Sequence, residues 1–165
     1  MKAWFTALRA LIYMAAFILL WGWMALGARR FDARIGLALP DWLKPFGVAV
    51  MVVGGAIVLA CIGWFVVRGR GTPAPFDPPR EFVATGPYKS VRNPMYVGGL
   101  ILLIGFGLQQ QSVSILLFAL LAALLVHLLV VLLEEPDLER RFGRSYVKYK
   151  ATVHRWLPRW PGRAA

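Results

Sequence analysis

The sequence has few of the residues on which many catalytic and metal sites are built. Its single cysteine, Cys61, lies inside an apolar run, so an intramolecular disulfide and a cysteine-based metal cluster are both excluded. Its two histidines, His127 and His154, do not have the spacing of a helical zinc motif. Serine-nucleophile, phosphate-loop and dinucleotide-binding motifs are also absent from the sequence. We therefore predict no metal site.

Charge is absent from long stretches of the chain. Apolar residues make up 59% of the sequence, above the roughly half found in soluble domains, and charged residues make up 16%. A membrane-spanning helix needs about 20 mostly apolar residues. The sequence therefore predicts an all-α, polytopic membrane protein with a single domain over residues 1–165 and about four transmembrane helices. These spans are expected at about residues 10–28, 46–67, 94–108 and 113–133.

The first run has an alternative interpretation as a cleaved signal peptide. Its length and the Arg29–Arg30 pair that follows it both disfavour cleavage, so we interpret it as a span. The last two spans come from one uncharged stretch, Pro94 to Leu133, which Gln109–Gln111 divides. Glutamines are costly in lipid without partners, so a tight helical hairpin is predicted with its turn at the far surface.

The tail beyond Glu135 is polar and basic. Its larger apolar residues recur at a spacing of three to four, which predicts an amphipathic helix along the membrane surface. These residues are Leu138, Phe142, Tyr146, Tyr149 and Val153. In a four-span topology, fifteen of the 19 lysines and arginines fall on the side of the two termini. Both termini are therefore expected in the cytoplasm. We assign the formal charge of +11 to topology and contact with membrane lipids, and expect no nucleic-acid partner.

Two polar features should meet at the cytoplasmic edge. Asn93 and Pro94 are typical of a helix start, with Arg92 just before it. Glu134 and Glu135 follow the last span, and the hairpin returns the chain to the side from which it left. The positive helix start suits the carboxylate of an amino-acid ligand, and a glutamate suits its ammonium group. His127 falls on roughly the same helix face as Glu134. We interpret it either as a histidine bonded to a neighbouring helix or as a functional group at membrane depth.

The ordered set of motifs in residues 80–160 resembles a known family. It comprises Gly-Pro-Tyr-x-x-Val-Arg-Asn-Pro-x-Tyr-x-Gly at 86–98, Glu134-Glu135-x-x-Leu-x-x-x-Phe-Gly-x-x-Tyr-x-x-Tyr, and Val-x-Arg-x-x-Pro at 153–158. The set is similar to the isoprenylcysteine carboxyl methyltransferase and phospholipid methyltransferase group. The resemblance implies that S-adenosylmethionine binds at the cytoplasmic face in the half of the chain from about 80 to 160. It also implies a lipidic or isoprenoid acceptor, with a carboxylate, amine or hydroxyl group, entering from the bilayer.

The resemblance also implies site residues. Carried over by position, the cofactor pocket is lined by Glu81, Phe82, Val83, Tyr88, Asn93, Pro94, Met95, Tyr96 and Glu134. The candidates for catalysis are Arg92, Glu135 and Tyr146. A carboxylate acceptor needs no base, whereas an amine or hydroxyl acceptor would use Glu135, helped by Tyr146.

Three positions depart from the family pattern. Asn93 stands where the family often has histidine, and His154 where it often has proline. Val130 replaces an arginine associated with the acceptor in eukaryotic prenylcysteine enzymes, which weighs against a prenylcysteine carboxylate here. Two other classes of function are left open by the sequence. One is an NADPH-dependent membrane reductase resembling sterol reductases, and the other is a non-enzymatic membrane scaffold or transport accessory protein.

Overall fold

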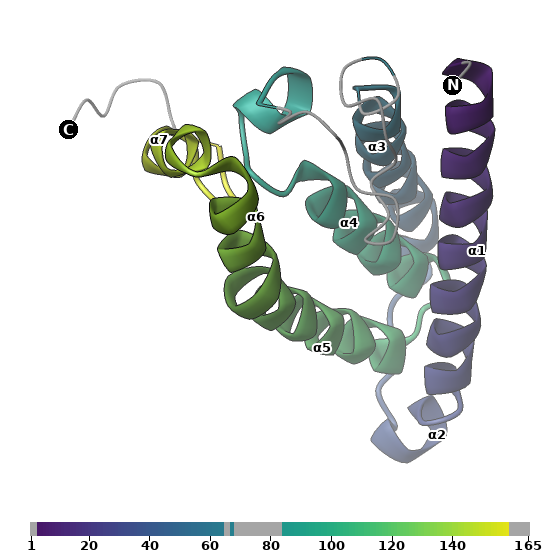
Figure 1. The fold of residues 1–165 in the computed structure, drawn as a ribbon. Helices are drawn as coiled ribbons and strands as arrows, with labels where there is room; N and C mark the ends of the chain where they lie inside the picture. Colours follow the sequence, from purple (N-terminus) through teal and green to yellow (C-terminus); the bar gives the residue numbers. More distant parts are fainter. Residues whose placement is uncertain (1–2, 65–66, 68–83, 159–165) are drawn as a thin grey trace.

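The computed structural model describes residues 3–64, 67 and 84–158, and this part of the chain is helical (Figure 1). Three long helices and one shorter apolar helix form the body. The elements in chain order are α1 (Ala3–Arg29), α2 (Asp32–Ile35), α3 (Leu43–Trp64), η2 (Gly86–Lys89), α4 (Pro94–Gln109), α5 (Val113–Leu129), η3 (Val130–Glu134), α6 (Glu135–Phe142) and α7 (Arg144–Thr152). The predicted all-α architecture is confirmed.

The long helices have the length and composition of membrane spans. The segments Leu11–Ile35, Leu43–Trp64 and Val113–Phe142 each meet both criteria, and α4, with 16 residues, is shorter. At about 1.5 Å per residue α4 is about 24 Å long, less than a hydrocarbon core of about 30 Å. The outward side chains of α5 are mostly leucine, and Leu120 is 69% exposed. Such a surface fits lipid, so the chain is an integral membrane protein with several spans.

Helices α3 and α4 pack closely because glycines line their contact. A Cβ atom at Gly47 would lie 2.5 Å from the main-chain nitrogen of Gln109, and one at Gly105 would lie 2.6 Å from that of Met51. Gly54 makes the same kind of approach to Leu102. Small residues at such positions let helix backbones approach each other in a membrane.

The predicted hairpin is present, and its glutamines find partners. Gln110 accepts a hydrogen bond from Arg29 at 2.9 Å, and Gln111 donates to the carbonyl oxygen of Leu39 at 2.8 Å. Asp32 accepts from the main-chain nitrogen of Ser114 in the first turn of α5, at 2.8 Å. These bonds join the α1–α3 connection to the hairpin turn. Figure 1 shows α2 at this lower end and α6 and α7 at the opposite end.

The last span differs from its predicted bounds. The helix does not end at residue 133 but passes through η3, a π-helical turn, into α6. Pro136 begins a new first turn, so it does not interrupt the helix. The tail forms two short helices where one was expected, because Gly143 adopts a positive φ of 53° between α6 and α7. Tyr146 and Tyr149 of α7 are buried against the rest of the protein.

Candidate active site

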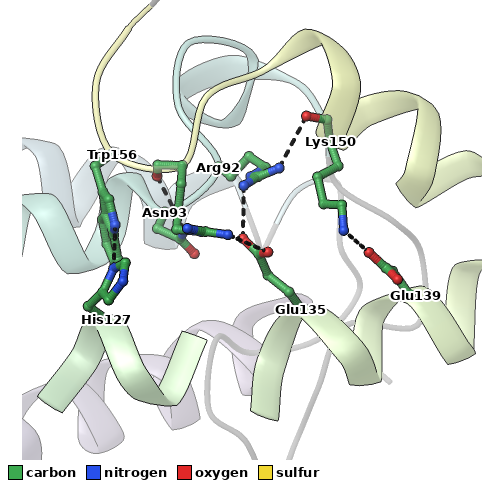
Figure 2. Close-up of polar contacts among 8 residues, drawn as sticks. Arg92, Asn93, His127, Glu135, Glu139, Lys150 and Trp156 are labelled. Carbon is green, nitrogen blue, oxygen red and sulfur yellow. Dashed lines mark hydrogen bonds and ion pairs between the residues drawn. The ribbon is translucent and has the colours of Figure 1, made fainter. Parts of the chain in front are cut away.

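The two polar features predicted to meet do lie together. The guanidinium of Arg92, just before α4, forms an ion pair of 2.9 Å with the carboxylate of Glu135 at the start of α6. The two side chains are only 8% and 7% exposed. Arg92 also donates to the carbonyl oxygen of Lys150 in α7, at 3.2 Å (Figure 2). Residues that are distant in sequence are therefore brought to one end of the hairpin.

A second arginine holds the same carboxylate. Arg155 donates from Nε and Nη2 to the two oxygens of Glu135, at 2.7 and 2.9 Å. This bidentate geometry is the strongest form of such a pair. The hydrogen bond from Arg155 to Glu135 raises the pKa of the arginine further. We call Arg92, Glu135 and Arg155 the ion triad. Because both carboxylate oxygens are engaged by guanidinium groups, these contacts favour an anchoring role for Glu135 over its predicted role as a general base.

The segment Val153–Trp156, here called the C-terminal strap, crosses the ends of α4 and α5. The main-chain nitrogen of Arg92 donates to the carbonyl oxygen of His154 at 2.8 Å. Asn93 donates from Nδ2 to the carbonyl oxygen of Arg155 at 3.3 Å. Asn93 is in the N-cap position of α4, as predicted, but its side chain makes no capping bond. Its amide instead holds the strap.

Glu134 faces a different partner from its neighbour. The hydroxyl of Tyr96, in the first turn of α4, donates to Oε1 of Glu134, and both side chains are half-buried. The π-helical turn η3 ends at Glu134, and π-turns are frequent at functional sites because they change the direction of side chains. The two adjacent glutamates thus have different partners: Glu134 bonds to a tyrosine, and Glu135 bonds to two arginines.

Buried tyrosines form the side of the site nearest η2. Tyr149 donates to the carbonyl oxygen of Tyr88 at 2.6 Å, and Tyr88 packs with Cys61 and Met95. Burial, with a further contribution from the Glu135 charge, raises the pKa of Tyr146 to about 12. Tyr146 is therefore a neutral phenol near neutral pH. As a proton donor or a hydrogen-bond donor it fits the site, but as a phenolate base it does not.

The described part of the chain brings together most of the predicted site residues. The end of the hairpin that holds the ion triad contains Arg92 to Tyr96, Glu134, Glu135 and Tyr146, and Tyr88 lies beside them. Glu81, Phe82 and Val83 fall outside the described residues. Sequence reasoning missed Arg155 and Trp156 as parts of the site. The motif Val-x-Arg-x-x-Pro contained Arg155, but its spacing does not reveal that the side chain returns to Glu135.

Comparison with known proteins identifies the family. Residues 43–145 match the family described as phospholipid methyltransferase. The chain belongs to this family. Its members are methyltransferases that use S-adenosylmethionine, which agrees with the predicted enzyme class and cofactor and favours them over the reductase alternative. The match contains α3 to α6 and the ion-pair partners Arg92 and Glu135, whereas the C-terminal strap lies beyond it.

Two relatives show the range of the similarity. The chain is 28% identical over 144 residues to a methanethiol S-methyltransferase from Pseudomonas deceptionensis, with 86% of this chain and 54% of that protein aligned. It is 34% identical over 120 residues to the nickel-cobalt-cadmium resistance protein NccN of Alcaligenes xylosoxydans xylosoxydans, with 72% and 53% aligned. The chain spans about half the length of these curated relatives. Within its described residues, no group of three or more His, Cys, Asp or Glu side chains is arranged to hold a metal ion.

Proposed function

We propose that this protein transfers a methyl group from S-adenosylmethionine to an acceptor at one face of the membrane. One observation carries the proposal: the half-buried carboxylate of Glu134 lies beside the uncapped start of α4, held there by Tyr96. A carboxylate next to a helix N-terminus offers opposite charges to the two ends of an amino-acid moiety.

The residues present fit the cofactor. Tyr96 bonds one oxygen of Glu134, which leaves the other for the ammonium group. The side chain of Asn93 does not cap α4, so main-chain N–H groups of its first turn are suited to the carboxylate. Tyr88, Pro94 and Met95 supply apolar surface, and we propose the same role for Phe82 and Val83, with Glu81 as a polar contact. The cofactor supplies an electrophilic methyl group on a sulfonium.

The chain's own contribution to rate is proposed to be positioning and exclusion of water. The ion triad holds α4, α6 and the C-terminal strap in a fixed arrangement, and the neutral side chain of Tyr146 packs beside it. Removing water favours a reaction in which opposite charges are neutralised. On these contacts we propose that Glu135 acts by fixing the site and that no side chain of the ion triad takes a proton.

The acceptor is proposed to reach the site from the bilayer. The exposed leucine side chains of α5 form a lipid-facing surface that runs toward Glu134. Such an apolar surface suits a lipidic or isoprenoid molecule. A relative named for methanethiol supports a wider proposal that includes small apolar acceptors. We also propose that this end of the protein, with both termini, faces the cytoplasm, because a four-span topology assigns fifteen of the 19 lysines and arginines in the sequence to that side.

Transfer of a radiolabelled methyl group tests the proposal. Membranes containing the protein are incubated with tritiated S-adenosylmethionine and either total lipid extract or a short alkanethiol, and organic-soluble label is counted. We expect label above that of empty membranes, lost in Glu134→Ala and kept in Glu139→Ala, which removes a carboxylate that pairs with Lys150 outside the cofactor site. Equal labelling by wild type and Glu134→Ala would contradict the assigned site.

A further inference from the structure

His127 is the one ionisable side chain within the apolar part of α5, and the C-terminal strap reaches it. Nε1 of Trp156 donates to Nδ1 of His127 at 3.1 Å, and the two rings lie 6.0 Å apart between centroids (Figure 2). His127 is half-buried. It precedes Glu134 by seven residues and lies about 10 Å deeper, and the π-helical turn η3 between them shifts the two side chains off the common face expected for a regular helix.

The tryptophan determines where the imidazole carries its proton. An indole nitrogen only donates hydrogen bonds, so the imidazole nitrogen that it meets must be unprotonated. A neutral His127 then carries its proton on Nε2, and Nδ1 is already engaged. His127 in this state presents Nε2–H as a hydrogen-bond donor. Trp156 therefore orients and fixes the tautomer of a polar group inside the membrane.

The Nε2–H group has no hydrogen-bond partner within the described residues. A donor left unpaired at membrane depth costs free energy, and polar groups in such positions commonly mark the path of a substrate. The ion triad carries one net positive charge, from two guanidinium groups and one carboxylate, and the neighbouring Glu134 carboxylate is reserved for the ammonium group of the cofactor in the proposed site. An anion, which has lone pairs to spare, is favoured beside this donor, whereas an ammonium group has no acceptor to offer it.

We propose that His127 is the acceptor-binding group of this site, with Trp156 as its positioning residue, and that the acceptor presents a thiolate or carboxylate, not an amine. This inference rests on the proposed methyltransferase function. In the transfer, a lone pair of the acceptor anion forms the new bond to the methyl carbon while the methyl–sulfonium bond breaks and its electron pair returns to that sulfur. A thiol loses its proton to water before transfer, since the thiolate is the nucleophile.

Three eight-carbon probes distinguish the acceptor classes in detergent-purified protein: octanethiol, octanoate and octylamine. We expect the thiol or the carboxylate to be methylated with a higher kcat/KM than the amine. In His127→Leu, kcat/KM for that probe should fall about tenfold or more through a raised acceptor KM, as expected for a lost donor to a charged group. His127→Gln, whose amide also donates, should recover most of the loss. Arg144→Leu is the control, since that side chain is exposed and lies outside the strap and the ion triad.

Two further measurements do not depend on turnover. The affinity for S-adenosylhomocysteine should change by less than about twofold in His127→Leu, because the cofactor contacts are elsewhere. Nitrogen NMR shifts of wild type should show a protonated Nε2 and an unprotonated, hydrogen-bonded Nδ1, with this tautomer less populated in Trp156→Phe.

Several results would overturn the inference. In the kinetics, they are an unchanged kcat/KM in His127→Leu or no recovery in His127→Gln. In the NMR measurement, it is a protonated Nδ1. In the comparison of probes, it is a wild type that binds S-adenosylhomocysteine yet methylates octylamine best, or methylates none of the three probes. A wild type that does not bind S-adenosylhomocysteine at all would instead overturn the proposed function.

Discussion

At the scale of residues, the adjacent glutamates Glu134 and Glu135 have different surroundings that their sequence could not distinguish. The spacing of the hairpin predicted that both would lie near Arg92. Which of them would pair with arginine depends on η3 and on the strap, and neither is visible in a motif. Tyr96 bonds one carboxylate oxygen of Glu134, whereas guanidinium groups bond both oxygens of Glu135.

The ion triad predicts unequal costs for two arginine substitutions. Arg155→Met should lower the free energy of unfolding by about 1.5–3 kcal/mol, the range for hydrogen bonds to a charged group. Arg141→Met should cost less than about 1 kcal/mol, because its pair with Asp137, at 3.5 Å, is much more exposed. Chemical unfolding in detergent measures both. Equal losses would show that the bidentate contact does not stabilise the fold.

At the scale of elements, hydrophobic runs and turn residues predicted most of the fold. The uncharged runs gave α1, α3, α4 and α5 to within a few residues at most ends, and Asn93–Pro94 marked the start of α4. The break at Gly143 was missed because the apolar period continues through it, and a single glycine does not by itself reveal that the chain adopts a positive φ there. The close contacts between α3 and α4 at Gly47 and Gly105 could not be predicted, because these glycines carry no distinguishing pattern in the sequence.

Two glycines of α4 give a direct test of the α3–α4 contact. Gly105→Ala should destabilise the protein by about 1–3 kcal/mol, because its Cβ would lie 2.6 Å from the Met51 main-chain nitrogen and must displace a backbone. Gly99→Ala, with nothing within 4 Å of its added Cβ, should be neutral or stabilising, since alanine favours helix. Thermal unfolding in one detergent compares them. Similar midpoints for the two variants would argue against the close packing.

At the scale of the whole molecule, the fold has two polar ends joined by apolar helices. One end, with Arg29, Asp32 and the glutamines, ties the hairpin turn to the α1–α3 connection. The other end joins the start of α4, the end of α5 and the strap. The strap could not be predicted, because its contacts link Arg92 with His154 and His127 with Trp156 across segments whose spacing follows no local period.

Binding of S-adenosylhomocysteine to detergent-purified protein, measured by calorimetry, tests the central claim most directly. We predict saturable binding by wild type and by Glu139→Ala, and an affinity at least about tenfold lower in Glu134→Ala, as expected when a charged partner of the ammonium group is removed. Circular dichroism confirms that each variant is helical. A folded wild type without binding, or full affinity in Glu134→Ala, would contradict the account.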